Sequence, residues 1–170
     1  MADKLYLRPL KLKDIDLVMT WVNDPKVIKN LQHFNKKFTR KEEQAFIRKS
    51  LKSKNDFIFS IFRKSDNGYI GQGAINQIIW ENKLGRLSLI IKKEHWGKGY
   101  AQQAIPLILR FAFNQLKLHK VWLMVYATNK KAKHIYMKFG FKKEALLKEE
   151  YFWRGHYHDI IRVGILKAAR

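Results

Sequence analysis

The sequence of 170 residues contains no cysteine. Disulfides, thiolate nucleophiles, cysteine-based zinc sites and iron–sulfur clusters are therefore all excluded. Proline is rare, with three residues, and the nine glycines are not gathered into a linker. The chain also lacks internal repeats and low-complexity segments. We therefore expect a single domain over residues 1–170, a length that one hydrophobic core can fill.

Long hydrophobic runs are also missing. The first ten residues, MADKLYLRPL, contain no apolar signal core. No stretch approaches the roughly 18 consecutive apolar residues that a membrane-spanning helix needs. These two absences predict a cytoplasmic protein.

Acidic residues are scarce, with 14 Asp and Glu against 35 Lys and Arg, so the formal net charge is +21. Hydrophobic residues make up 46% of the chain, which excludes a disordered basic tail. Residues 1–85 carry 17 basic and 9 acidic side chains, whereas residues 86–170 carry 18 and 5. The second half is the better candidate for binding an anion. A polyanionic small molecule, a nucleic acid and anionic lipid headgroups all stay open as partners.

Hydrophobic periodicity and turn residues predict alternating strands and helices. Asp14 is a candidate cap for a helix that stops at Asn23–Pro25, and Thr39 with Glu42 forms a capping-box pattern. The order β-α-α-β-β-β-α-β-α-β-β indicates an α/β domain with a mixed sheet. Strands are expected at 4–9, 57–62, 69–79, 87–91, 121–126 and on both sides of 154–155, and helices at 14–23, 39–51, 100–116 and 129–139.

A glycine loop, Trp96-Gly97-Lys98-Gly99-Tyr100-Ala101, joins an expected strand to the long helix that follows. Such a loop binds phosphate, because glycines let the backbone approach and the helix N-terminus supplies partial positive charge. It is not a Walker A loop, and Gln102 stands where a dinucleotide fingerprint has its third glycine. From the spacing alone, an ordinary tight turn is an equally good interpretation.

A second segment follows the expected strand 121–126. Asn129 stands at the N-cap of the next helix, and Ala132 and Tyr136, four residues apart, share one helix face. Gly140 and Phe141 follow this helix. Each residue alone favours a structural role, Asn129 as a cap and Tyr136 as a half-buried aromatic.

Together, the two segments resemble the cofactor-binding half of the GNAT superfamily of N-acetyltransferases. The glycine loop is similar to that family's Gln/Arg-x-x-Gly-x-Gly/Ala, with Trp96 in place of a polar residue. The family's Asn-x-x-Ala-x-x-x-Tyr-x-x-x-Gly-Phe is matched from Asn129 to Phe141. The segments 7–10, 21–25 and 154–159 resemble the branch that includes ribosomal-protein, spermidine, amino-sugar and antibiotic acetyltransferases.

This resemblance implies a mostly antiparallel seven-stranded sheet, splayed at the acetyl-CoA site and flanked by about four helices. It implies acetyl-CoA as cosubstrate, no metal, and direct attack by a primary amine in a ternary complex. Tyr136 would protonate the leaving thiolate as the catalytic residue. The cofactor-binding residues implied are Leu89, Ile90, Ile91, Trp96, Gly97, Lys98, Gly99, Tyr100, Ala101, Gln102, Asn129, Ala132 and Tyr136.

The amine acceptor is less defined. This branch commonly carries an acid where Arg86 stands here, and the spermidine enzymes carry acids near the segment 31–37, which has none in this chain. The net charge would also repel a polycation. We therefore expect a protein N-terminus or a small-molecule amine such as an amino sugar, with a polyamine less favoured.

Several alternatives remain beside this interpretation. A basic nucleic-acid- or ribosome-binding module on the same fold would use the charge and the aromatic–basic segment 151–154; that segment would also suit a homodimer contact. His33 and His95 are candidate bases, although a satisfied histidine is favoured for each. His156 and His158 lack a third metal ligand at a supporting spacing. No membrane partner is expected.

Overall fold

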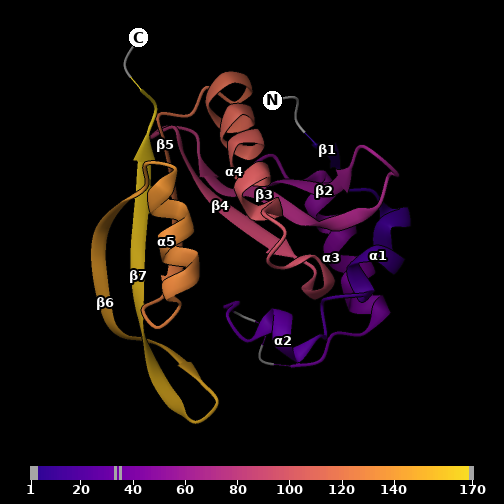
Figure 1. Ribbon diagram of the computed structural model, residues 1–170, viewed down its shortest axis with the longest axis horizontal. Coiled ribbons are helices and arrows are strands. Elements are labelled where there is room, and N and C mark those ends of the chain that lie inside the picture. The colour runs from indigo at the N-terminus through magenta and orange to yellow at the C-terminus, as the bar shows by residue number, and fades with distance from the viewer. Residues whose placement is uncertain (1–3, 33, 35, 169–170) are drawn as a thin grey trace.

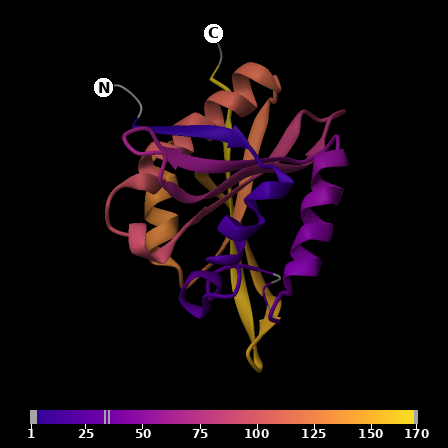
Figure 2. The ribbon, with the colours of Figure 1, turned by 90° about the vertical axis from the view of Figure 1, so that its right-hand side faces the viewer.

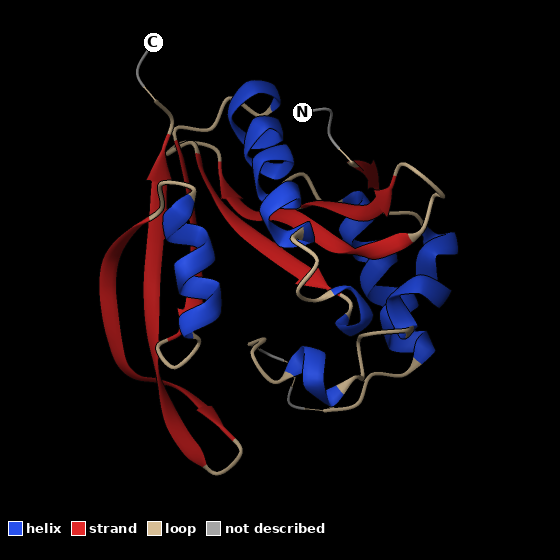
Figure 3. Cartoon of the chain, viewed as in Figure 1, coloured by secondary structure: helices blue, strands red, loops and turns tan. Residues whose placement is uncertain are grey.

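The computed structural model describes residues 4–32, 34 and 36–168. Seven strands form one sheet in the order β1-β2-β3-β4-β5-β7-β6, drawn in red in Figure 3. Every described pair of neighbours is antiparallel except β4 and β5. The strands are β1 (Leu5–Pro9), β2 (Phe57–Arg63), β3 (Tyr69–Ile79), β4 (Leu84–Ile91), β5 (Lys120–Tyr126), β6 (Lys142–Trp153) and β7 (His156–Leu166).

Helices cover both faces of this sheet. Figure 2 shows α4 and α5 on one side of it and α1 and α3 on the other. The α-helices among the described residues are α1 (Ile15–Met19), α2 (Pro25–Ile28), α3 (Arg40–Lys52), α4 (Tyr100–Arg110) and α5 (Lys130–Lys138). The mixed, mostly antiparallel seven-stranded sheet is confirmed, and α2 is an additional short helix. No helix in the described part of the chain is long and apolar enough to cross a membrane.

The capping box ahead of α3 is present. The Glu42 amide donates to Thr39 Oγ1 at 3.2 Å, and the Thr39 amide donates to Glu42 Oε2 at 2.7 Å. These two bonds satisfy amide groups that the first turn of a helix would otherwise leave without partners. The local sequence signal at Thr39 therefore predicts the start of α3 correctly.

Asp14 is the N-cap residue of α1, as the sequence predicts, but its side chain makes no capping hydrogen bond to that helix. The buried Asp14 carboxylate instead accepts hydrogen bonds from Arg8 Nη2 at 2.7 Å, the Lys11 amide at 2.9 Å and Ser60 Oγ at 2.9 Å. Arg8 and Ser60 face each other across the β1–β2 ladder. The carboxylate therefore joins two strands to the turn before α1, an arrangement that the local pattern of a capping residue does not reveal.

The main core lies between α4 and the sheet. Ile105 and Ile108 of α4 pack with Ile75, Leu87 and Val121. On the other face, a second cluster under α1 and α3 includes Ile15, Val18, Trp21 and Ile47. Both faces of the central strands are therefore covered, as the long apolar runs in β2 and β3 require.

The expected helix 100–116 has two parts. After α4, residues 111–115 continue as a π-helical turn, in which the Leu116 amide donates to the Phe111 carbonyl at 3.1 Å. The Phe111 ring packs edge-on against Phe59 at 4.8 Å and also contacts Phe57 at 5.6 Å between centroids. Packing against β2 therefore accompanies the change of helical geometry.

The strands β4 and β5 diverge. They pair at only three positions, the last being Arg86 with Trp122, although β4 continues to Ile91 and β5 to Tyr126. In Figure 1, β4 separates progressively from the half of the sheet that holds β7 and β6. The inner edge of β4 beyond Arg86 is therefore not paired with β5, and backbone groups on such an edge can bind a ligand.

Candidate active site

The glycine loop is held in a backbone conformation that favours glycine. Gly97 has φ of 75° and Gly99 has φ of 74°, both in the left-handed region. A Cβ atom added at either residue would have no described heavy atom within 4 Å. The loop therefore presents bare backbone to open space, which is the geometry that a phosphate group needs for close approach.

Helix α4 begins at this loop without a side-chain cap. Gly99 is its N-cap residue, and no described side chain accepts a hydrogen bond there. The Gln103 amide makes the helix bond to the Gly99 carbonyl at 3.3 Å. The three amides before it, from Tyr100 to Gln102, lie in the first turn, where a helix leaves N–H groups free. Together with the helix dipole, they form an anion-binding end.

Side chains around the loop fix its position. Trp96 Nε1 donates to the carbonyl of Ile91, the last residue of β4, at 2.7 Å. The Tyr100 hydroxyl accepts from Arg63 Nη1 at 3.1 Å, and its ring packs edge-on against His95. The tryptophan that departs from the family pattern thus ties the loop to the strand before it. Tyr100 offers its amide to the site, whereas its side chain turns toward β2.

The end of β4 lies beside this loop. Leu89 and Ile91 pack against the cluster that includes Ala104 of α4, whereas Ile90 packs against the cluster under α1 and α3. The two sets of side chains alternate between the faces of the sheet, as in a regular strand. One backbone edge of β4 pairs with β3. The opposite edge is left unpaired here because β5 diverges from it.

Helix α5 supplies the second segment. Asn129 is its N-cap, and its Oδ1 accepts from the Ala132 amide at 3.1 Å. The capping role is confirmed, and the side-chain amide group remains as a hydrogen-bond donor. Ala132 and Tyr136 are half-buried against the main core. They lie one turn apart on the helix face that the sequence predicts they share.

Tyr136 combines a polar group with an apolar setting. Its ring packs edge-on against Phe141, with 5.5 Å between centroids. Burial raises the pKa of the Tyr136 phenol above its ordinary value of 10.0. A phenol with a raised pKa stays protonated at neutral pH and can therefore act as a proton donor.

The fold therefore places the two sequence segments on the same side of the sheet. Figure 1 shows α4 and α5 on the same side of the sheet, in front of the diverging strands. An anion-binding helix end, an open strand edge and a neutral phenol lie on this face. The exposed Lys98 adds positive charge at the loop. Such a set can bind an extended, phosphate-bearing acyl donor and protonate its leaving group.

The opposite face of the divergent strands carries Arg86 and Trp122. The Arg86 guanidinium lies over the Trp122 ring, 5.7 Å from its centroid, and Arg86 Nη2 donates to Gln32 Oε1 at 2.9 Å. Gln32 follows α2, so Arg86 faces the side of the sheet that α1 to α3 cover. The sequence predicts Arg86 at the end of a strand but not its contact with Gln32.

A cavity of about 700 Å³ lies between the α2 region and the tip of the β6–β7 hairpin. Figures 1 and 2 both place α2 and this tip at the same end of the molecule. Trp153 in its wall stacks on Tyr126 at the end of β5, with 6.3 Å between centroids. The residues that line the cavity are Asn23, Pro25, Ile28, Phe34, Lys36, Lys37, Phe152, Trp153 and Arg154. No local motif connects residues so far apart in the sequence.

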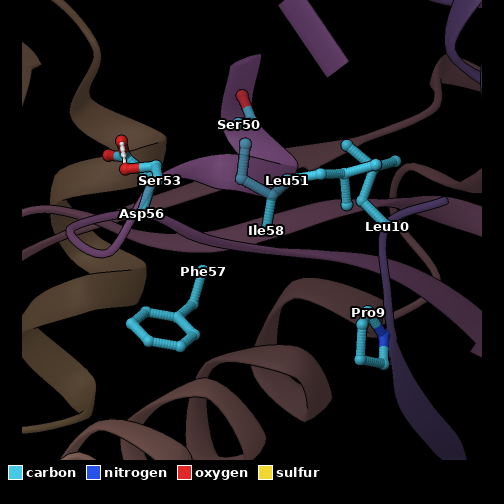
Figure 4. A pocket seen from close by; sticks show the side chains of 8 residues that line it. All are labelled: Pro9, Leu10, Ser50, Leu51, Ser53, Asp56, Phe57 and Ile58. Atoms are coloured by element: carbon cyan, nitrogen blue, oxygen red, sulfur yellow. Dashed lines mark hydrogen bonds between the residues drawn. The ribbon is translucent and has the colours of Figure 1, made fainter. Parts of the chain in front are cut away.

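A smaller pocket of about 120 Å³ lies elsewhere, where β1 ends and β2 begins. In Figure 4 it is lined by eight side chains, and Ser53 and Asp56 are joined by a hydrogen bond of 2.6 Å. None of the predicted site residues lines it. We therefore place the candidate site at the divergent strands and not in this pocket.

The remaining histidine candidates do not form a site. His95 Nε2 is paired with the Tyr69 carbonyl at 3.1 Å, and burial lowers the pKa of His95. His156 and His158 lie close together, 4.2 Å between centroids, and each faces a backbone carbonyl. No group of three potential metal ligands occurs among the described residues. His33 lies outside the described residues.

Comparison with known proteins adds to this picture. A model of the acetyltransferase (GNAT) domain matches residues 4–142. A spermidine N(1)-acetyltransferase of Vibrio cholerae is 35% identical over 108 residues, which cover 64% of this chain and 62% of that protein. The corresponding Escherichia coli (strain K12) protein is 29% identical over 172 residues, covering 98% and 88%.

A solved structure is similar over nearly the whole chain. The crystal structure of spermidine N-acetyltransferase from Vibrio cholerae in complex with CoA and spermine has a TM-score of 0.90 and 28% sequence identity to this protein. The match covers 97% of this chain and 96% of that one.

Proposed function

This chain belongs to the GNAT acetyltransferase family and is an acetyl-CoA-dependent N-acetyltransferase; we propose that an acceptor amine attacks the acetyl donor directly, between the diverging strands β4 and β5. The observation that carries the proposal is the divergence of these strands beside the N-terminus of α4, where Gly99 is the N-cap residue and no described side chain caps the helix. That geometry provides an anion site, an open backbone edge and a route between the two faces of the sheet.

In the proposed site, amides of the loop and of the first turn of α4 bind the diphosphate of acetyl-CoA. The open edge of β4 and the amide of Asn129 bind the pantetheine arm. The whole predicted set takes part, from the edge of β4, the loop and the two helices: Leu89, Ile90, Ile91, Trp96, Gly97, Lys98, Gly99, Tyr100, Ala101, Gln102, Asn129, Ala132 and Tyr136. The uncapped start of α4 and the open space above Gly97 and Gly99 support this assignment.

Tyr136 serves as the general acid in this proposal. Acetyl-CoA supplies an acetyl thioester whose carbonyl carbon accepts the amine. As the new C–N bond forms and the C–S bond breaks, Tyr136 donates its proton to the sulfur, and the amine loses a proton to solvent. A thiol has a pKa of about 8.5 and a phenol about 10. The pKa of Tyr136 is raised further by burial, so the phenol is protonated at the start of each cycle.

In this proposal, the acceptor approaches from the cavity on the other face of the sheet. A small-molecule amine, such as an amino sugar, or a protein N-terminus would reach the thioester through the gap between β4 and β5. A polyamine is the second candidate. The comparisons favour it, because the relatives reported above are spermidine N-acetyltransferases. The three acceptor classes differ in charge, and this makes them separable by experiment.

Three further expectations remain proposals. One sheet includes both β1 and β7, which supports a single domain over residues 1–170. Phe152 and Tyr157 are exposed near the hairpin tip and pack against each other at 5.0 Å, which supports a homodimer contact there. A cytoplasmic location remains the expectation from the sequence.

A thiol-release assay tests the proposed function. Purified protein is mixed with acetyl-CoA and one amine at a time: spermidine, an amino sugar, an aminoglycoside or an N-terminal peptide. Free thiol that appears only with protein and amine together supports N-acetyl transfer, and mass spectrometry should find the amine 42 Da heavier, as expected for an added acetyl group. If every amine leaves thiol release at the background rate, the proposal is wrong.

A further inference from the structure

Arg86 is a partly buried cation without a described anionic partner. The described partner of its guanidinium is the neutral side-chain oxygen of Gln32, and its Nε is buried without a hydrogen bond. No carboxylate of the described residues lies within 4.0 Å of it. Burial accordingly lowers the pKa of Arg86, although a guanidinium remains charged at neutral pH.

Other partly buried arginines of the protein are neutralised. Arg8 pairs with Asp14 at 2.7 Å, and Arg162, which also lies over the Trp122 ring, is 3.4 Å from a Glu144 oxygen. A buried charge without a partner is costly, and proteins normally pair it. Arg86 therefore differs from Arg8 and Arg162, because no described carboxylate neutralises it and its guanidinium is still able to bind an anion.

The cavity between the α2 region and the tip of the β6–β7 hairpin carries the same sign of charge as Arg86. Lys36, Lys37 and Arg154 line it, whereas none of its described lining residues is acidic. Glu42 neutralises Lys36, but Lys37 and Arg154 have no described ion pair. Gln32, which binds Arg86, and Phe34, which lines the cavity, are only two residues apart in the sequence. This end of the molecule attracts anionic groups and repels polycations.

The position of Arg86 connects this charge to the proposed reaction. Arg86 and Trp122 are the last paired residues before β4 and β5 diverge. A ligand anion bound at Arg86 would place the rest of the ligand at the beginning of the gap, on the face opposite α4 and α5. An amine a few bonds away could then reach the thioester from that side.

Building on the proposed N-acetyl transfer, we propose that the acceptor is a small primary amine that also carries a phosphate or a carboxylate, and that Arg86 binds this anion. Arg86 is then a specificity-determining residue. A planar guanidinium suits this task, because its paired N–H groups match the oxygens of a phosphate or carboxylate.

Matched acceptor pairs test the proposal. Glucosamine 6-phosphate is compared with glucosamine, serine with serinamide, and spermidine serves as the polycation. The wild type should use the anionic member of a pair about 10- to 100-fold better in kcat/KM, the effect of one charge-assisted contact. The two pairs distinguish a phosphate-bearing from a carboxylate-bearing acceptor. The proposal is wrong if spermidine or the neutral members are used equally well or better.

Arg86→Gln should remove the preference by raising KM for the anionic acceptor until the two members of a pair differ by less than about threefold in kcat/KM. Arg48→Gln, an exposed site on α3, removes the same charge at a distance and should leave the preference intact. A loss of preference in both variants would mean that net charge alone is responsible, and it would overturn the role of Arg86.

Folding is checked by thermal melting. Arg86→Gln should melt no lower than the wild type, because it removes an unpaired buried charge. If it does not fold, the exposed double variant Lys37→Glu with Arg154→Glu reverses the charge at the cavity and should weaken anionic acceptors while improving spermidine. An unchanged preference in that double variant contradicts the proposal. If wild-type protein acetylates amines but shows no charge preference, N-acetyl transfer stands and only the assignment of Arg86 fails.

Discussion

Burial controls ionisation at single residues in this protein. Tyr136 is kept neutral because its surroundings disfavour the phenolate, and Arg86 is kept without a carboxylate although it is charged. Asp14 shows the opposite case, in which hydrogen bonds outweigh burial. Each of these side chains is therefore expected to respond differently to a conservative substitution.

Tyr136→Phe removes the proposed proton donor and retains the ring that packs against Phe141. We expect kcat to fall by about 10²-fold, the usual contribution of a general acid, with the Kd for acetyl-CoA nearly unchanged. Steady-state kinetics and calorimetry measure the two effects. Because the pKa of Tyr136 is raised, wild-type kcat should show no loss from its deprotonation between pH 7 and about 9. Unchanged kcat in Tyr136→Phe would remove this residue from the acid role.

Asp14→Asn should destabilise the fold by about 3 kcal/mol, because it leaves the partly buried Arg8 without its carboxylate. Burial acts to raise the pKa of Asp14. The hydrogen bonds from Arg8, Lys11 and Ser60 have a larger opposite effect, so the pKa lies below its ordinary value of 3.8. Its stabilisation is therefore fully present above the unfolded pKa of about 3.9 and is lost as pH falls through the folded value.

Urea denaturation at several pH values measures this. The difference between the wild type and Asp14→Asn should shrink as pH falls below about 4. Asp16→Asn is the matched control, since Asp16 pairs with Arg40 on the surface and its loss should change stability little. Equal effects of the two substitutions would show that Asp14 is not the strand-joining carboxylate described above.

At the scale of elements, the order of strands and helices along the chain and most helix positions were predictable from the sequence. The capping box at Thr39 and the glycine after α5 are local signals. Helices α3 and α5 accordingly begin and end within two residues of the predicted limits. Helix α2 and the π-helical turn at 111–115 were missed. A single turn is not stable by itself, so its formation depends on tertiary packing that the local sequence does not encode.

Gly99→Ala tests the glycine-led start of α4. The positive φ at this position should cost about 1 kcal/mol of stability, and the new methyl group would enter the space proposed for the diphosphate. We expect the Kd for acetyl-CoA to rise about tenfold or more, measured by calorimetry.

Gly155→Ala is the matched control, because Gly155 also has a positive φ and open space but lies in the β6–β7 turn. It should lose similar stability and retain acetyl-CoA affinity. If both variants bind acetyl-CoA as the wild type does, the cofactor does not approach the loop at Gly99.

At the scale of the whole molecule, 35 basic residues outnumber 14 acidic ones. Some of this excess positive charge lies on each face of the proposed site. Positive charge occurs both at the glycine loop, through Lys98, and at the acceptor-side cavity, through Lys37 and Arg154. A donor with several phosphates and an anionic acceptor would each use part of it. The same positive charge would also suit a nucleic-acid partner. Thermal stabilisation distinguishes such a partner from acetyl-CoA.

Acetyl-CoA at about 100 times its Kd should stabilise the native state by about 2.7 kcal/mol. For a chain of this size, that corresponds to a rise in Tm of roughly 5–10 °C. Differential scanning fluorimetry measures the shift, with a short ribosomal RNA duplex as the comparison. Stabilisation by the RNA but not by acetyl-CoA would favour the binding-module alternative over the enzyme.

The element order, the capping box and the two motif segments could be predicted from local sequence, because each depends on residues within about one helix or turn of one another. The divergence of β4 and β5 after Arg86 and Trp122 could not, nor could the contact of Arg86 with Gln32, 54 residues away, instead of a carboxylate. Contacts of that kind follow from strand register and from which loops pack across a face. The composition shows only that acidic residues are scarce, whereas the tertiary structure shows that Arg86 is a position without a described acidic partner.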